Sequence, residues 1–279
     1  MANRWFDFLP LVLVAVVWAA PVAHADAEDN APTPLPRAHA HNDYEHDRPL
    51  FDALDHGFCS VEVDIFLVDG ALLVAHDRED CTPGRTLERL YLDPLQERVK
   101  ENGGTVYPDG PGFTLLVDIK NTGPETLTAL LDALAPYEDM LTRFTGEGIE
   151  TGAVTVVVSG WFPRDQLIGT LPRLAAADGR LPHLGNDPKD YPLVSENWGK
   201  VFQWRGAGVL PPMDAQLLEQ IVVRAHQAGQ RVRFWNLPPG GRAWPVLYEE
   251  GVDLINVDDL EALEAFLLRK MGKQKDNAR

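Results

Sequence analysis

The chain has 279 residues, an apolar share of 45% and a formal net charge of −17. This length suits one large domain, and the negative charge repels nucleic-acid phosphates and anionic lipid surfaces at long range. We therefore expect a globular protein that does not bind nucleic acid and does not adsorb unaided to acidic membranes.

Residues 1–25 are predicted to be an export signal that is absent from the mature protein. Arg4 supplies a positive charge, residues 9–20 form an apolar run, and Ala23-His24-Ala25 is a small-x-small cleavage site. The apolar run is shorter than the ~20 residues that a membrane-spanning helix needs. We expect a periplasmic or secreted protein without stable membrane insertion, with an uncleaved anchor as the alternative.

The mature chain is predicted to be a flexible leader followed by one domain. Residues 26–36 are rich in Pro, Ala and Asp and show no apolar period, which predicts the leader. From residue 37 to residue 279, β-rich runs alternate with amphipathic stretches, as in a parallel sheet with crossover helices. The expected strands are 37–41, 60–66, 113–119, 154–159, 231–235 and 252–256, and the expected helices are 49–56, 87–100, 125–135, 215–227 and 259–268.

This alternation over ~250 residues is typical of a TIM (β/α)8 barrel in a single α/β domain. A barrel of eight strands needs two more from residues 171–208, where Gly, Pro and Asn interrupt the short apolar runs. The fifth and sixth strands are therefore expected to be irregular. Asp69-Gly70 predicts a tight turn that folds the second strand back as a hairpin.

The two cysteines could form a disulfide after export. Cys59 is expected at the start of a barrel strand and Cys81 in a loop beyond its opposite end. This places their Cα atoms further apart than the ~7 Å that a disulfide tolerates. A buried, unpaired Cys59 is the favoured interpretation, and pairing stays open.

Three acidic side chains are expected together at the carboxyl ends of two strands. Glu62 and Asp64 lie two residues apart and so share the inner face of one strand, and Asp118 ends another apolar run. Burying these carboxylates costs several kcal/mol unless a positive charge compensates them. Mg²⁺ and Ca²⁺ prefer carboxylate oxygens, so we expect one divalent cation at Glu62, Asp64 and Asp118. The alternatives are a solvated strand face or an ion pair with a distant arginine for Glu62 and Asp64, and a local ion pair with Lys120 for Asp118.

Two histidines are expected at the same barrel mouth. His41 closes the first strand, and His76 follows the returning arm of the hairpin. Imidazoles titrate near neutral pH and transfer protons in either direction. His41 and His76 are therefore candidates for a base and an acid that act on one bound molecule.

Taken together, these residues resemble the PI-PLC-like phosphodiesterase superfamily, which includes glycerophosphodiester phosphodiesterases and sphingomyelinase D. The matching pieces, in chain order, are His41-Asn42-Asp43-Tyr44, Glu62-x-Asp64, His76-Asp77, Asp118-x-Lys120, Trp235 and Ile255-Asn256-Val257-Asp258. Within this superfamily, the chain most resembles the subgroup called altered inheritance of mitochondria protein 6. The segments that carry this resemblance are Ser60-Val61-Glu62-Val63-Asp64, His76-Asp77-Arg78 and Arg233-Phe234-Trp235.

The resemblance implies a metal-dependent phosphoric diester hydrolase that acts on a glycerophosphodiester or a phospholipid-like substrate. His41 and His76 would perform acid–base catalysis, and one Mg²⁺ or Ca²⁺ would bind the three carboxylates. Lys120, Trp235 and Asn42 would contact the substrate. The chain lacks the His-Arg-Gly and Pro-Glu-Asn motifs of the glycerophosphodiesterases. This absence weakens the case for glycerophosphodiesters as the substrate.

Two other functions are compatible with the sequence. His39-x-His41 also fits the first zinc ligands of a TIM-barrel amidohydrolase, although that site needs further histidines from later strands. A ligand-binding relative without catalytic activity could keep the same barrel, because one fold hosts many functions. Metal preference and turnover of a phosphodiester separate these possibilities.

Overall fold

The computed structural model describes residue 1 and residues 31–108, 110–121 and 123–277. Apart from Met1, the predicted export signal lies outside the described residues. Residues 32–279 form one compact unit. None of the described helices combines the length and the apolar character that crossing a membrane requires.

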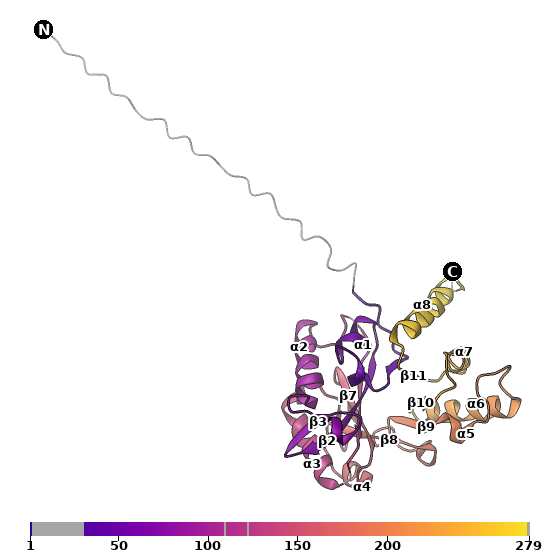
Figure 1. Cartoon of the computed structure of the whole chain (residues 1–279), viewed down its shortest axis with the longest axis horizontal. Coiled ribbons are helices and arrows are strands. Elements are labelled where there is room, and N and C mark those ends of the chain that lie inside the picture. Colours follow the sequence, from indigo (N-terminus) through magenta and orange to yellow (C-terminus); the bar gives the residue numbers. More distant parts are fainter. Residues whose placement is uncertain (2–30, 109, 122, 278–279) are drawn as a thin grey trace. The chain divides into compact units, whose positions relative to one another are not determined.

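Eight of the described strands are parallel and close into a barrel. Neighbouring strands in the barrel follow one another in the chain, and pairing of β1 with both β2 and β11 closes the ring. Figure 1 shows β8, β9, β10 and β11 following one another in this order. The predicted TIM barrel is therefore confirmed. The strands are β1 (Ala38–Ala40), β2 (Ser60–Val68), β4 (Phe113–Ile119), β7 (Val154–Gly160), β8 (Ala175–Gly179), β9 (Leu193–Asn197), β10 (Arg231–Trp235) and β11 (Leu254–Val257).

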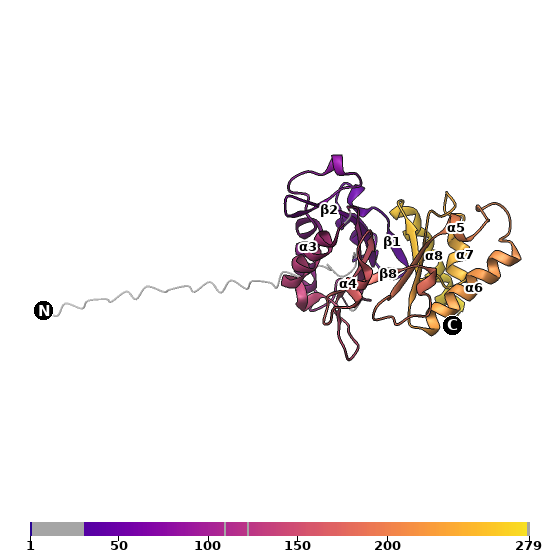
Figure 2. The same ribbon diagram turned by 90° about the horizontal axis from the view of Figure 1, so that it is seen from below.

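Helices cover the outside of the barrel. Figure 2 shows α3 and α4 beside the first strands and α5 to α8 beside the last ones. In α3, Leu127, Leu130 and Leu134 are completely buried, which is the apolar stripe of a helix that packs on a sheet. The helices are α1 (Phe51–Asp55), α2 (Asp93–Glu101), α3 (Pro124–Leu134), α4 (Arg164–Ile168), α5 (Trp198–Val201), α6 (Pro212–Gln227), α7 (Trp244–Glu249) and α8 (Leu260–Asn277).

Smaller elements join these strands and helices. The strand β3 (Ala71–Val74) pairs antiparallel with β2 through a turn at Asp69 and Gly70, as predicted. Both turn residues have positive φ, of 50° and 85°, as a two-residue hairpin turn of type I′ requires. The other short elements are β5 (Arg143–Phe144), β6 (Ile149–Glu150), the 3-10 turns at Asp43–Glu45, Arg78–Asp80, Ala135–Met140 and Leu181–His183, and a π turn at Glu88–Leu92.

The fifth and sixth barrel strands, β8 and β9, lie in the region that was expected to supply them. Their pairing is short, because only Asp178 with Leu193 and Gly179 with Val194 are in register. This bears out the predicted irregularity. The helix expected over residues 87–100 is confirmed, but its first part, Glu88–Leu92, is a π-helix. The α-helical part, α2, follows, and its second residue, Pro94, has no N–H to donate to the preceding turn.

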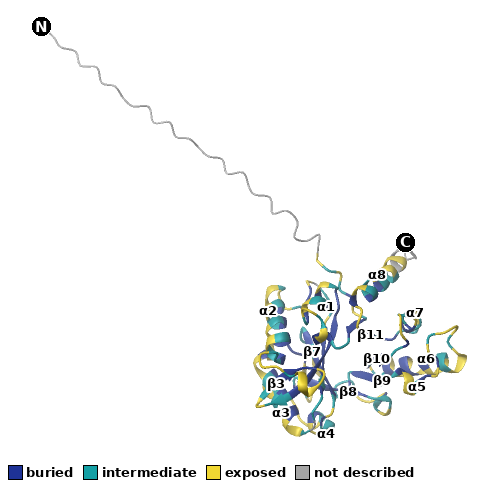
Figure 3. Ribbon diagram, in the orientation of Figure 1, coloured by how far each residue is buried: buried dark blue, intermediate teal, exposed yellow. Residues whose placement is uncertain are grey.

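The core lies between the barrel and its helices, where Figure 3 shows the strands as buried. Val61, Val63 and Ile65 are completely buried on the outer face of β2, so the alternate residues of this strand point into the barrel. This alternation turns Glu62 and Asp64 toward the barrel axis.

Two details concern the start of the domain and the cysteines. Residues 26–30 of the predicted leader lie outside the described residues, but Leu35 near its end is buried and its N–H donates to the carbonyl of Gly57. The ordered domain thus begins before the expected boundary at Arg37. Cys59 and Cys81 are both free, and Cys59 is buried, as the favoured interpretation expected.

Candidate active site

A cavity of about 270 Å³ opens at the carboxyl ends of the barrel strands. We call it the phosphate cavity, after the ligand that is proposed for it below. Its lining includes all but one of the side chains that the sequence predicted for the site, and the exception, Asp64, is completely buried. The predicted residues that line it are His41, Asn42, Glu62, His76, Asp118, Lys120 and Trp235.

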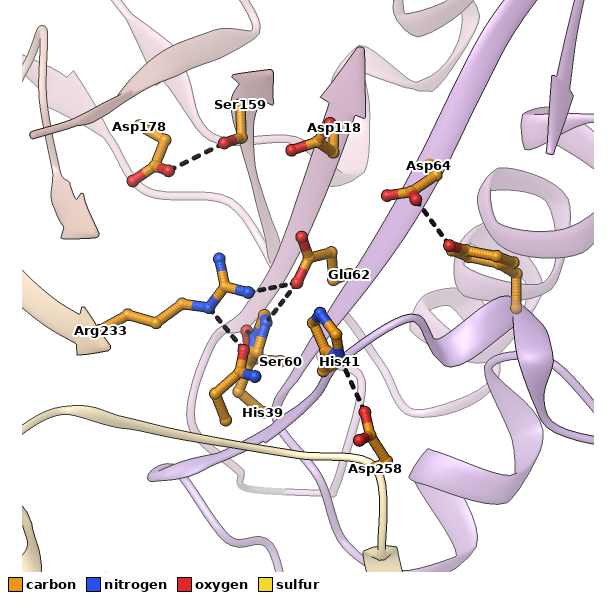
Figure 4. A network of polar contacts seen from close by, with 12 residues as sticks. His39, His41, Ser60, Glu62, Asp64, Asp118, Ser159, Asp178, Arg233 and Asp258 are labelled. Carbon is orange, nitrogen blue, oxygen red and sulfur yellow. Dashed lines mark hydrogen bonds and ion pairs between the residues drawn. The ribbon is translucent and has the colours of Figure 1, made fainter. Parts of the chain in front are cut away.

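The three predicted acids come together at this cavity, which Glu62 and Asp118 line. Asp64 of β2 is in register with Asp118 of β4, and Glu62 lies one inward position earlier on β2 (Figure 4). One oxygen of each carboxylate lies within 4.8 Å of the others. The neighbouring strand leaves room for them, because a Cβ on Gly160 would lie 2.6 Å from the Asp118 carboxylate.

Burial and nearby cations set the protonation of this cluster. Burial raises the pKa of Asp64 to about 6, although Lys120 Nζ lies 2.9 Å away and Tyr44 Oη donates to the carboxylate at 2.6 Å. Burial likewise raises the pKa of Asp118. Burial alone would lower the pKa of Lys120, but the two aspartates outweigh it and raise that pKa. The lysine is therefore charged.

Glu62 is held in its ionised form from the opposite wall of the barrel. Burial would raise its pKa, but the Arg233 guanidinium, which pairs with one carboxylate oxygen, and the His39 imidazole at 3.5 Å lower it instead. Arg233 also donates from Nε to Asn256 at 2.8 Å. Burial and Arg233 lower the pKa of His39 to about 3, so this imidazole is neutral.

The carboxylate cluster fits a hard divalent cation. Asp64 Oδ1 is buried and has no hydrogen-bond partner among the described residues. An orphaned carboxylate oxygen in a barrel interior costs free energy unless another positive group meets it. Three carboxylates face two cations, Lys120 and Arg233, which leaves one negative charge uncompensated. Oxygen donors of this kind are those that Mg²⁺ and Ca²⁺ prefer.

Both predicted histidines lie at the cavity, and each is held through Nδ1. His41 follows β1 and bonds Asp258 at 2.7 Å; burial would lower the pKa of its imidazole, but Asp258 and the charge of Glu62 raise it. The same hydrogen bond lowers the pKa of Asp258. His76 Nδ1 lies 3.0 Å from Tyr44 Oη, whose proton goes to Asp64. Nε2 of each ring is therefore the nitrogen that can donate a proton to a bound molecule or accept one from it.

Several functional side chains were not singled out from the sequence. Tyr44, Arg233 and Asp258 stand inside the motifs that carried the resemblance, and that placement was the available signal. The fifth strand adds a further group: Arg180 lines the phosphate cavity and pairs with the buried Asp178 at 2.5 Å, and Ser159 donates to the same carboxylate at 2.9 Å. Nothing in the Ala-rich sequence of β8 indicated this pair.

The histidines in the described part of the chain do not assemble into the zinc site of an amidohydrolase. His39 is completely buried, with Nδ1 2.7 Å from Ser60 Oγ. His183 stacks on Tyr191, and His226 bonds Asp253. Within the described ranges, the one group of three metal-capable side chains is the carboxylate cluster. The geometry therefore favours oxygen ligands over imidazole ligands.

A closed parallel barrel with acids, a lysine and two histidines at the carboxyl ends of its strands defines a PI-PLC-like phosphodiesterase fold. The family model described as the AIM6-like phosphodiesterase domain matches residues 29–171, and the chain belongs to this family.

Curated relatives and a solved structure agree with this assignment. Altered inheritance of mitochondria protein 6 homolog of Arthroderma benhamiae is 30% identical over 264 residues, which cover 84% of each chain. Altered inheritance of mitochondria protein 6 of Eremothecium gossypii is 33% identical and covers 83% of this chain and 69% of its own. The crystal structure of a glycerophosphodiester phosphodiesterase from Parabacteroides distasonis superposes with a TM-score of 0.53 at 14% identity, covers 86% of this chain and 100% of that one, and supports the fold alone.

Proposed function

We propose that the protein is an exported, divalent-cation-dependent phosphoric diester hydrolase that uses His41 and His76 as its acid–base pair. The observation that carries this proposal is the phosphate cavity, where two imidazoles held through Nδ1 flank three clustered carboxylates and Lys120. The phosphodiesterase family of the domain supports the reaction class. A glycerophosphodiester or a phospholipid headgroup is the proposed substrate, and a nucleic acid is not.

Glu62, Asp64 and Asp118 would hold one Mg²⁺ or Ca²⁺, which supplies positive charge for the phosphate oxygens when it is bound. Lys120 lies 2.9 Å from Asp64 and 3.4 Å from Asp118, so its ammonium borders the same position and donates to a phosphate oxygen. Positive charge fixed where the transition state gains negative charge lowers the barrier, because no solvent has to reorganise. Trp235 and Asn42 border the bound substrate at the cavity rim.

The histidines take different parts in the proton transfers. His41 accepts the proton of the nucleophile, because the Asp258 carboxylate stabilises the imidazolium that forms. His76 starts in its protonated form and donates its own Nε2 proton to the oxygen of the leaving alcohol, while its Nδ1–H donates to Tyr44 Oη and so fixes the ring. The nucleophile is water or a neighbouring hydroxyl of the substrate, and the second route yields a cyclic phosphate.

Hydrolysis of bis(p-nitrophenyl) phosphate, glycerophosphodiesters and lysophospholipids by residues 26–279 tests this function. We expect turnover with Mg²⁺ or Ca²⁺ and its loss with a chelator, and ³¹P NMR distinguishes cyclic from open products. Secretion of the full chain with cleavage after Ala25 tests export. If none of these substrates is hydrolysed while a cation is bound, the catalytic proposal is overturned. If turnover continues in the presence of the chelator, the metal requirement is overturned.

Asp258→Asn is expected to move the acidic limb of the pH profile of kcat/KM toward lower pH. Asp258 raises the pKa of His41, whose neutral form is the base, so activity falls as the pH drops through that pKa. Without the carboxylate, burial dominates and lowers the pKa, and the imidazole stays neutral in more acidic solution. Initial rates measured across pH at saturating cation check this shift. An unmoved limb would show that His41 is not the titrating base.

A further inference from the structure

A larger cavity of about 680 Å³ lies beside the phosphate cavity. The loop that follows β10 forms one wall, with Leu237, and the end of β11 and the start of α8 form the other, with Asp258 and Asp259. His41 lines both cavities, so they meet at the proposed base. An alcohol group of a diester centred in the phosphate cavity would enter the larger one past this imidazole.

The two cavities differ in the cations that they offer to an anion. The phosphate cavity is lined by three permanent cations, Lys120, Arg180 and Arg233, beside the acidic Glu62 and Asp118. Within the described residues, the larger cavity has no Lys or Arg in its lining, and its charged side chains besides His41 are Asp258 and Asp259. An anionic group in the larger cavity would meet like charges without a compensating partner, which disfavours its binding.

The start of α8 does not reverse this conclusion. A helix N-terminus attracts anions, because its first N–H groups lack partners within the helix. Here Asp259 accepts the N–H of Ala262 at 3.0 Å and so already occupies that end with a carboxylate of the chain. The proximity of α8 therefore adds no free anion site to the cavity.

The apolar part of the lining is held in place before any ligand binds. Trp244 packs against Phe266 with ring centroids 5.8 Å apart, and Gly241 lies close to the indole, since a Cβ there would be 2.9 Å from the ring. Pro238 and Pro239 restrict the backbone of the same loop. An aromatic face near carboxylates suits a cationic or neutral group, and the volume is that of an ordinary ligand site.

We propose that this larger cavity, the alcohol subsite, binds one alcohol group of the phosphodiester and accepts an uncharged or cationic alcohol but rejects one that carries a carboxylate or a phosphate. This inference rests on the proposed function and assigns the substrate class of the same site. Trp244 supplies the contact face, and Asp259 supplies the discrimination against anions.

Symmetric phosphodiesters test the subsite, because identical arms force the same alcohol into the larger cavity in either orientation. The probes are the diesters of choline, ethylene glycol and glycolate, followed by ³¹P NMR in 0.5 M salt to screen the surface charge. We expect kcat/KM for the glycolate diester to be about tenfold or more below that for the glycol diester. Bis(p-nitrophenyl) phosphate serves as the reference for turnover.

Two variants locate the discrimination. Asp259→Asn keeps a helix-capping side chain but removes its charge, and it should raise the glycolate to glycol ratio about threefold. Trp244→Ala should lower kcat/KM for the choline diester more than for the glycol diester. Glu219→Gln, on the exposed side of α6, is the control for total charge and should leave both ratios unchanged.

The outcomes separate the subsite from the proposed function. Equal turnover of the glycolate and glycol diesters, or an equal change of their ratio in Glu219→Gln and Asp259→Asn, would overturn the subsite while the phosphodiesterase assignment stands. Loss of turnover of every diester, the reference included, would overturn the proposed function and the subsite with it.

Discussion

His41→Ala and His76→Ala are each expected to reduce kcat for bis(p-nitrophenyl) phosphate by about 10²- to 10⁴-fold, the usual contribution of a positioned acid or base. Both side chains are partly exposed at the barrel mouth, at 32% and 52%, so their truncation opens no cavity in the core. The melting temperature and the cation affinity should therefore stay close to those of the unchanged protein. Initial rates, thermal unfolding and cation titration of each variant measure the three quantities.

The matched control is His56→Ala. His56 is 33% exposed and bonds Glu264 at 2.7 Å, so it repeats the imidazole–carboxylate pair of His41 and Asp258 outside the phosphate cavity. Its loss should leave kcat unchanged. Near-normal rates in both His41→Ala and His76→Ala, or an equal loss in the control, would contradict the acid–base assignment.

The parts of the site that could be predicted from sequence are those governed by local periodicity. On β2 the alternation of Val61, Val63 and Ile65 with Glu62 and Asp64 assigns the acids to the inner face. An apolar strand that ends in Asp118 places that acid at the mouth, since TIM-barrel strands end there. These expectations needed only the two-residue period of a strand and the common direction of the strands in a TIM barrel.

The parts that were missed depend on closure of the barrel. Arg233 meets Glu62 across 171 residues of sequence, and Asp258 meets His41 across 217, because closure of the barrel brings β11 beside β1 and β10 next to β11. No local pattern encodes such a register. β8 was placed only by region, because Ala175, Ala176 and Ala177 have low strand propensity. Complete burial in the barrel outweighs that preference.

Asp64→Asn is expected to stabilise the protein in chelator and to destabilise it relative to the unchanged protein at saturating Mg²⁺ or Ca²⁺. Burial raises the pKa of Asp64 to about 6, whereas the pKa of an unfolded aspartate is near 3.8. At pH values above about 6 the buried, ionised carboxylate therefore destabilises the cation-free fold. This cost is on the order of 2–3 kcal/mol at neutral pH and disappears as the pH falls below the unfolded pKa. Asparagine removes the charge and still accepts the Tyr44 proton.

A bound cation reverses the order, because it stabilises only a fold that offers all three carboxylates, by an amount that grows with cation concentration. Melting curves of both proteins, with chelator and with each cation, should therefore cross. Asp178→Asn is the control: this carboxylate is equally buried but pairs with Arg180 and Ser159, so its loss should destabilise the fold under both conditions and preserve the cation shift. If the cation raised the melting temperature of Asp64→Asn as much as that of the unchanged protein, Asp64 would not be a ligand. That result would contradict the three-carboxylate site.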